Sequence, residues 1–272
     1  VIECRDLIPS VSARAGTARP TNCGVERGGM PSPRVGGRSV GCEGVGVVGV
    51  DLGLTRSVFS VVGDGASDLF SIVVGGLEAR GVPVRLIRAN GYFVFDVTYP
   101  SVDYYRGSEV VFNLFERVVS VIRNAFEMAS RWYGVVTALS LENLLSDKGL
   151  ARGIAKTWRL LLMALYNNKG AVEEVASYLG DARASIWCYD QWLTYNGHVL
   201  NLPGSNSYVV LVSPEYSSSL CPSCTRYLGP VRRGVEVVRP RCGFRGDADV
   251  VGSLNIAARG CCVLRRYLGG KS

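Results

Sequence analysis

The stretch Val45-Gly-Val-Val-Gly-Val-Asp51-Leu-Gly53 predicts the centre of the fold. Its apolar, β-branched run predicts a buried strand, and the glycine after the acid permits a tight turn. Arg56-Ser-Val-Phe-Ser-Val-Val62 predicts a second strand. Asp51 is either the polar end of a central strand or a site residue, and this stretch alone leaves both interpretations open.

The next segment shows strand patterns first and a helical pattern later. Three apolar runs predict further strands: Leu69–Val74, Val82–Ile87 and Tyr92–Thr98. From Ser108, an N-cap type of residue, apolar residues recur at helical spacing up to Gly134, which predicts one long helix. Val135–Leu141 predicts another strand, which leads into Glu142. A ribonuclease-H-like α/β layer requires this order of strands, long helix and further strand.

The last part of the chain combines helices, a strand and a cysteine knuckle. Residues 151–179 predict one or two helices with a break at Gly170, and Tyr208–Val212 predicts a buried strand. Cys221-Pro-Ser-Cys224 follows this strand. Further along, Cys242-Gly-Phe-Arg-Gly-Asp247-Ala-Asp249 leads directly into an apolar helix. Metal-binding thiols and a pair of acids therefore precede one helix start.

Composition sets the class of protein and of partner. The 272 residues carry a formal net charge of +7, with a pI near 9.0, which favours a nucleic-acid partner because basic side chains bind phosphate. No apolar run is long enough to span a membrane, and the start does not have the pattern of a signal peptide. Nine Cys with one CxxC fit a reducing cytosol and a metal site better than a disulfide framework. We therefore expect a cytoplasmic, nucleoid-associated protein.

Asp51, Glu142 and Asp249 stand at the ends or starts of predicted elements, where they could meet. Phosphodiester cleavage by two metal ions needs acids from distant segments that hold the ions about 3.5–4 Å apart. Hard carboxylate oxygens suit Mg²⁺. These three acids could therefore supply the ligands of Mg²⁺ or Mn²⁺.

The contexts of these acids resemble one family. The motifs are Val48-Val-Gly-Val-Asp51-Leu-Gly53, Leu139-Ser-Leu-Glu142-Asn-Leu144, Pro214-Glu-Tyr-Ser-Ser218, Cys221-Pro-Ser-Cys224, Cys242-Gly-Phe, Asp247-Ala-Asp249 and Asn255-Ile-Ala. Together they resemble the OrfB/TnpB proteins of insertion sequences, which are related to type V CRISPR effectors. The resemblance implies an RNA-guided, RuvC-like DNA endonuclease with a zinc ribbon inserted before the last acid. It also implies that Asp51, Glu142 and Asp249 are the catalytic ligands of Mg²⁺ or Mn²⁺, with Asp247 as a neighbouring polar residue.

The resemblance also implies a division of the chain. Residues 1–43, rich in Gly, Pro and Arg, are expected to be disordered. The first part of the RuvC-like domain is 44–212, the zinc-ribbon-like insertion is 213–246, and the last motif with the C-terminal helix is 247–272. We expect the N-terminal recognition half of the family to be missing before the first strand, so a separate recognition chain is one expected partner besides DNA and a guide RNA.

The zinc site departs from the family's pattern of two CxxC pairs. Cys221, Cys224 and Cys242 are the expected Zn²⁺ ligands, but Arg239 stands where the fourth Cys would be. The fourth ligand could come from His198, Cys188, Cys261 or Cys262, or from none of them. A second function class also stays open, because the net charge alone fits a nucleic-acid-binding protein of a transposon without useful catalysis.

Overall fold

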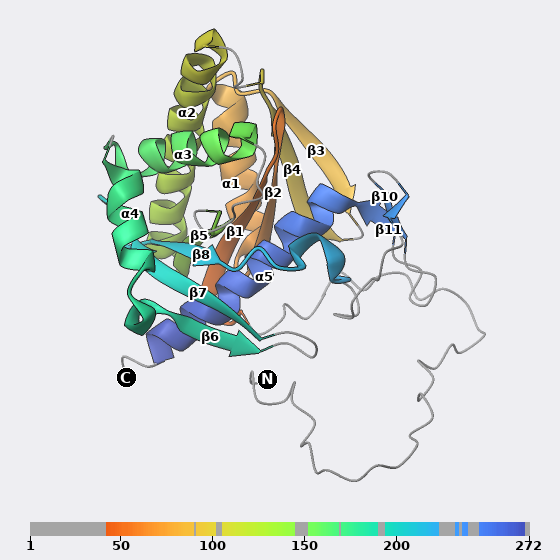
Figure 1. Ribbon diagram of the computed structural model, residues 1–272. Helices are drawn as coiled ribbons and strands as arrows, with labels where there is room; N and C mark the ends of the chain where they lie inside the picture. The colour runs from red at the N-terminus through yellow and green to blue at the C-terminus, as the bar shows by residue number, and fades with distance from the viewer. Residues whose placement is uncertain are drawn as a thin grey trace, which may run out of the picture.

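The computed structural model describes residues 42–89, 91–101, 105–144, 152–168, 170–189, 194–222, 232–233, 236–238 and 245–269. Its main feature is an eight-stranded sheet with the order β3-β4-β2-β1-β5-β8-β7-β6 (Figure 1). The strands of this sheet are β1 (Val45–Leu52), β2 (Arg56–Gly63), β3 (Val84–Ala89), β4 (Tyr92–Thr98), β5 (Val136–Glu142), β6 (Ile186–Tyr189), β7 (Thr194–Asn201) and β8 (Tyr208–Val212).

The sheet is mixed, and its strand pairing changes from antiparallel to parallel at β1. On one side, β1 pairs antiparallel with β2, β2 with β4, and β4 with β3. On the other side, β1, β5 and β8 run parallel, and the antiparallel hairpin of β7 and β6 extends the sheet. Antiparallel strands on one side of β1 and the parallel strands β5 and β8 on its other side confirm the predicted ribonuclease-H-like α/β fold.

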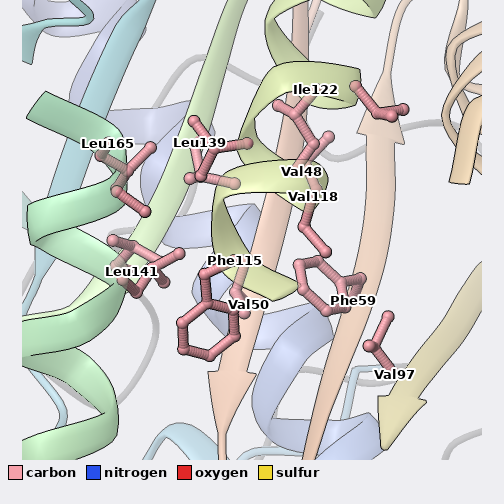
Figure 2. Close-up of a cluster of buried hydrophobic side chains, with 14 of the residues drawn as sticks. Val48, Val50, Phe59, Val97, Phe115, Val118, Ile122, Leu139, Leu141 and Leu165 are labelled. Carbon is pink, nitrogen blue, oxygen red and sulfur yellow. The ribbon is translucent and has the colours of Figure 1, made fainter. Parts of the chain in front are cut away.

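Four helices cover one face of this sheet (Figure 1). They are α1 (Ala66–Ala79), α2 (Tyr105–Tyr133), α3 (Arg152–Tyr166) and α4 (Ala171–Leu179). Figure 2 shows the core beneath them, where Phe115, Val118 and Ile122 of α2 face the β-branched residues of β1. Val48 and Val50 point into this core because alternate residues of a strand point to the same face. Burial of this apolar surface stabilises the sheet.

Helix α5 (Ala248–Gly269) crosses the opposite face of the sheet (Figure 1). It lies unusually close to the backbone of β1. A Cβ atom added at Gly49 would lie 2.5 Å from the backbone nitrogen of Ala257 and 2.5 Å from the carbonyl oxygen of Ser253. Gly49 therefore has no side chain for a steric reason, and the first half of α5 is held close to β1.

A separate three-stranded sheet lies at the place predicted for the insertion. Its strands are β9 (Arg232–Arg233), β10 (Glu236–Val238) and β11 (Arg245–Asp247). Of the three expected Zn²⁺ ligands, Cys224 and Cys242 lie outside the described residues, as does Arg239. Residues 1–41 of the segment expected to be disordered also lie outside them.

The structure corrects three expectations from the sequence. The predicted strand Leu69–Val74 lies within helix α1, where its apolar residues pack at helical spacing against the core. Ser108 lies inside α2 rather than capping it, because the helix begins at Tyr105. Cys42 and Cys261 form a disulfide between the start of β1 and helix α5, with their Cα atoms 5.7 Å apart. Since 219 residues separate them in sequence, spacing gave no sign of this pairing.

No helix among the described residues is long and apolar enough to cross a membrane.

Candidate functional site

Asp51 and Glu142 end neighbouring parallel strands on the same face of the sheet. The register pairs Val50 with Leu141, so the next residues of the two strands are neighbours. Leu141 and Val50 point into the core under the four helices, and the alternation of strand side chains turns Asp51 and Glu142 toward α5. Two acids that are 91 positions apart by residue number are thereby placed side by side, as the sequence predicted only by resemblance.

Asp249 lies in the first turn of α5, and the next turn of this helix contacts Asp51. A Cβ atom at Gly252 would lie 2.2 Å from Oδ2 of Asp51, so only glycine allows this approach. Residues three apart in a helix lie on the same face. The contact at Gly252 therefore brings Asp249 to the end of β1, next to Asp51.

The electrostatics of Asp51 reflect this crowding. Burial raises the pKa of the Asp51 carboxyl well above its ordinary value of 3.8. Glu142 and Asp249 raise this pKa further through repulsion, Asp247 adds a smaller effect of the same sign, and only Arg56 lowers it. Negative charge thus accumulates around a buried carboxyl, and an added cation would relieve it.

Asp247 begins α5 as its N-terminal cap. Its Oδ1 accepts the backbone N–H of Asp249 at 2.8 Å, which satisfies one of the free donors of the first turn. Its Oδ2 accepts a hydrogen bond from Nη2 of Arg56 at 3.0 Å. This capping contact agrees with the expectation that Asp247 is a neighbouring polar residue of the site.

Arg56 and Asp96 also belong to this site, and sequence reasoning missed both. Nη2 of Arg56 donates to Oδ2 of Asp249 and of Asp247, and its Nη1 lies 3.7 Å from Oδ2 of Asp96. Burial is the largest single influence on the pKa of Arg56 and lowers it. The hydrogen bonds to Asp247 and Asp249, together with the charges of these acids, outweigh burial, so the pKa of Arg56 is raised. The sequence did contain a signal for this pair, because Asp96 interrupts the apolar run Tyr92–Thr98. A carboxylate in a buried strand requires a cationic partner.

Tyr99 holds the turn that follows Asp51. Its hydroxyl donates to the carbonyl oxygen of Gly53 at 2.9 Å and lies 2.6 Å from Oγ of Ser57. Its ring packs edge-on against Phe115 of the helical face, with centroids 5.5 Å apart. Burial raises the pKa of Tyr99, so its hydroxyl stays protonated. One side chain therefore connects the apolar core with the turn beside the acids.

The loop before the insertion is also fixed by α5. Asn255 is buried, and its Nδ2 donates to the carbonyl oxygens of Ser217 at 2.5 Å and Leu220 at 2.8 Å. Cys221 follows this loop and is buried against Val237, Ala248 and Val251. The Asn255-Ile-Ala motif thus anchors the chain just before the first expected Zn²⁺ ligand.

The four alternatives for a fourth Zn²⁺ ligand lie on β6, β7 and α5. Cys188 and Cys261 are buried in the cluster between α5 and the sheet, which Cys262 also contacts, and Cys261 forms the disulfide with Cys42. His198 lies on β7 with its Nε2 3.4 Å from Oγ of Ser185, and burial lowers its pKa. None of the three cysteines belongs to the small apolar cluster that surrounds Cys221.

The donor types at the acid site fit a hard divalent cation. Asp51, Glu142 and Asp249 offer carboxylate oxygens, which Mg²⁺ and Mn²⁺ prefer, and repulsion from Glu142 and Asp249 adds to burial in raising the pKa of Asp51. In the part of the chain that the structure describes, no three His, Cys, Asp or Glu side chains are arranged as a ready metal site. Arg56 donates a hydrogen bond to Oδ2 of Asp249, which is one of the oxygens that the metal ion would use.

Comparison with known proteins adds one family match. Residues 204–256 match the family model described as Cas12f1-like, TNB domain, and this range includes Cys221 and Asp249. No curated protein matches the chain. Among solved structures, the chain is similar to the mini-RNA-guided endonuclease CRISPR-Cas_phi3, with 13% identity and a TM-score of 0.36. The similarity covers 80% of this chain and 45% of that one, so the chain spans less than half of that structure's length.

Proposed function

We propose that this protein is a metal-dependent DNA endonuclease of the RuvC type, akin to the TnpB and Cas12 nucleases and directed by a guide RNA. The observation that carries the proposal is the meeting of Asp51 and Glu142, in register on parallel strands, with the start of α5 at Asp249. The match of residues 204–256 to a Cas12f1-like domain supports the family assignment. The net charge of +7 supports a nucleic-acid substrate.

The reaction in this proposal is hydrolysis of a phosphodiester. A water oxygen bonds to phosphorus, the bond to the leaving oxygen breaks, and the products are a phosphate monoester and a hydroxyl. Mg²⁺ or Mn²⁺, held by Asp51, Glu142 and Asp249, would lower the pKa of the attacking water and stabilise the leaving oxygen. The chain's own contribution is to hold three carboxylates from distant segments in one place, because positioned ligands set the geometry of the attack.

The zinc ribbon belongs to the proposal as its second metal site. Cys221, Cys224 and Cys242 would bind Zn²⁺ as thiolates, with the fourth ligand left open. The metal content of the purified protein, measured with the native chain and a Cys221→Ser variant, tests this part independently of catalysis.

The direct test is cleavage of labelled single- and double-stranded DNA with Mg²⁺, with Mn²⁺ or with EDTA. We expect cutting that requires the metal and is lost in Asp249→Ala. Glu127→Ala is the matched control, since Glu127 is an exposed acid paired with Arg131 on the helical face. Cutting that is unchanged in Asp249→Ala, or unaffected by EDTA, would contradict the assignment.

A nucleic-acid-binding role without useful catalysis is the second candidate. The basic net charge favours it, as does the ion pair of Arg56 with Asp249, which engages an expected metal ligand. It predicts salt-dependent DNA or RNA binding that needs no divalent ion and survives Asp249→Ala. Binding that is flat between low and physiological salt would count against this role.

A further inference from the structure

Arg56 is the cation that lies among the acids of the candidate site. It is the first residue of β2 and ends the turn that follows β1. The bond from the N–H of Gly53 to the carbonyl oxygen of Arg56, at 2.9 Å, closes this turn. Its guanidinium contacts the start of α5 through Asp247 and Asp249. An arginine from one side of the sheet centre thus bridges to the helix that supplies the last acid.

A buried carboxylate holds Arg56 from the other side. The side chain of Asp96 on β4 is fully buried, and it pairs with both Arg56 and Arg85. Arg85 contacts both carboxylate oxygens of Asp96, with its Nε 3.2 and 3.1 Å away. Removing one partner of a buried carboxylate is costly, which fixes these arginines in place. Of the two, Arg56 is the one that reaches α5.

The ion pair uses an oxygen that the proposed reaction requires. Oδ2 of Asp249 accepts a hydrogen bond from Arg56, and a carboxylate oxygen engaged by a guanidinium is less available to a metal ion. The surrounding charge still favours a divalent cation, because Asp51 lies among Glu142, Asp247 and Asp249. One guanidinium therefore only partly compensates the acids, and a doubly charged ion compensates more.

We infer that Arg56 is a resident counter-ion of the carboxylate site, which competes with the divalent metal for Asp249 and so sets the metal affinity of the site. This inference rests on the proposed function. Metal binding would release the guanidinium from Asp249, while Asp96 would keep it within the site. The freed donors of Arg56 would then lie beside the bound ion, where a phosphate group of the substrate needs a bidentate partner.

A purely structural role for Arg56 makes a different prediction. If Arg56 served only to fix the N-terminus of α5, its replacement would lower stability and either weaken metal binding or leave it unchanged. Competition predicts the reverse for metal binding, because removing the competitor leaves Asp249 free. Metal affinity, rather than activity, therefore separates the two roles.

The test is the affinity of the full chain for Mn²⁺. It is measured by titration calorimetry and by the decrease in the electron paramagnetic resonance signal of free Mn²⁺. We expect Arg56→Gln to bind Mn²⁺ about tenfold more tightly than the native chain, a change within the usual range of coupling between two ligands. Arg56→Lys, which keeps the charge without the fork, is expected to lie between them. Arg80→Gln is the matched control, since Arg80 is exposed and donates to Oγ of Ser120 on α2 at 2.7 Å, and we expect native affinity.

The Asp249→Ala background completes a double-mutant cycle. If Arg56 acts through Asp249, Arg56→Gln will not change the Mn²⁺ affinity in that background. The inference would be overturned if both folded Arg56 variants bound Mn²⁺ no more tightly than the native chain while binding still depended on Asp249. The proposed function would then still stand. Mn²⁺ binding to the native chain that does not depend on Asp249 would instead contradict the proposed metal site, and the inference with it. Circular dichroism verifies that each variant is folded.

Discussion

The two faces of the central sheet are built by different means. The face under α1–α4 is apolar and carries large, fully buried side chains such as Phe59, Phe115 and Trp158. The opposite face meets α5 through glycines: Gly49, Gly252 and Gly260 would each place a Cβ atom within 2.5 Å of a neighbouring heavy atom. The first face fills space with side chains, whereas the second removes them so that backbone and carboxylates approach closely.

This difference separates stability from positioning. Burial of large side chains against four helices supplies the driving force for folding, since the gain scales with apolar area. Contact between α5 and β1 instead determines where Asp249 lies relative to Asp51. Substitutions on the first face should therefore lower global stability, while those on the second should also disturb the site.

Phe115→Ala should give the largest loss of stability. The ring is fully buried between α2 and the sheet and packs against Tyr99, so truncation removes apolar contacts and leaves a cavity. We expect the free energy of unfolding to fall by about 3–5 kcal/mol, measured by urea denaturation. Val110→Ala on the same helix, where the side chain is half exposed, should change it by less than about 0.5 kcal/mol. Equal effects of the two changes would contradict the apolar-face model.

Gly49→Ala should come next, and it tests the α5 face. The new methyl group would overlap backbone atoms of Ser253 and Ala257, which cannot move without shifting the helix. A loss of about 1–3 kcal/mol is expected, together with weaker Mn²⁺ binding as α5 moves away from β1. Gly75→Ala on α1, where a Cβ atom meets nothing within 4 Å, is the control and should be neutral or slightly stabilising. A Gly49→Ala protein as stable as the native one would refute the close approach.

Asp51→Asn should raise stability at neutral pH. Because the pKa of Asp51 is raised in the folded protein, the folded state binds more protons than the unfolded state above the ordinary value of 3.8. The contribution of Asp51 to the free energy of unfolding is fully present below pH 3.8 and is lost as pH rises through the pKa of Asp51 in the folded protein. The native chain should therefore lose stability relative to Asp51→Asn from pH 4 to 8, by on the order of 1 kcal/mol or more, in metal-free urea denaturation. A difference between the two proteins that does not vary with pH would rule out the raised pKa. The same change at the exposed Asp68 is the control.

Tyr99→Phe should have the smallest effect, and it tests the link between the two faces. The ring and its packing on Phe115 stay, while the bonds of the hydroxyl to Gly53 and Ser57 are lost. We expect a loss of about 0.5–1.5 kcal/mol in thermal or urea unfolding. Ser57→Ala should cost no more than this, since the bond from Tyr99 to Gly53 remains. A larger effect of Ser57→Ala would show that the turn is held by Ser57 instead.

The strands of the sheet centre followed from local patterns, but some elements did not. Val45–Val50 and Tyr208–Val212 were predicted correctly because continuous β-branched runs favour buried strands. Leu69–Val74 was predicted as a strand from a short apolar run, yet its neighbours extend it into a helix whose one face packs on the core. Short apolar runs leave that choice to tertiary packing. The hairpin of β6 and β7 gave no clear pattern, since it completes the sheet edge through pairing with β8.

The sequence by itself determined the type of fold, because strand and helix periods and the order of the elements are local properties of the chain. Its resemblance to one family, rather than any local property, singled out Asp51, Glu142 and Asp249 as the expected site and Asp247 as their polar neighbour. Only the tertiary structure decided that Arg56 and Asp96 join the acids and that Cys42 meets Cys261. Such contacts depend on strand register and on the close packing of α5, and both arise from pairings between residues far apart in the chain.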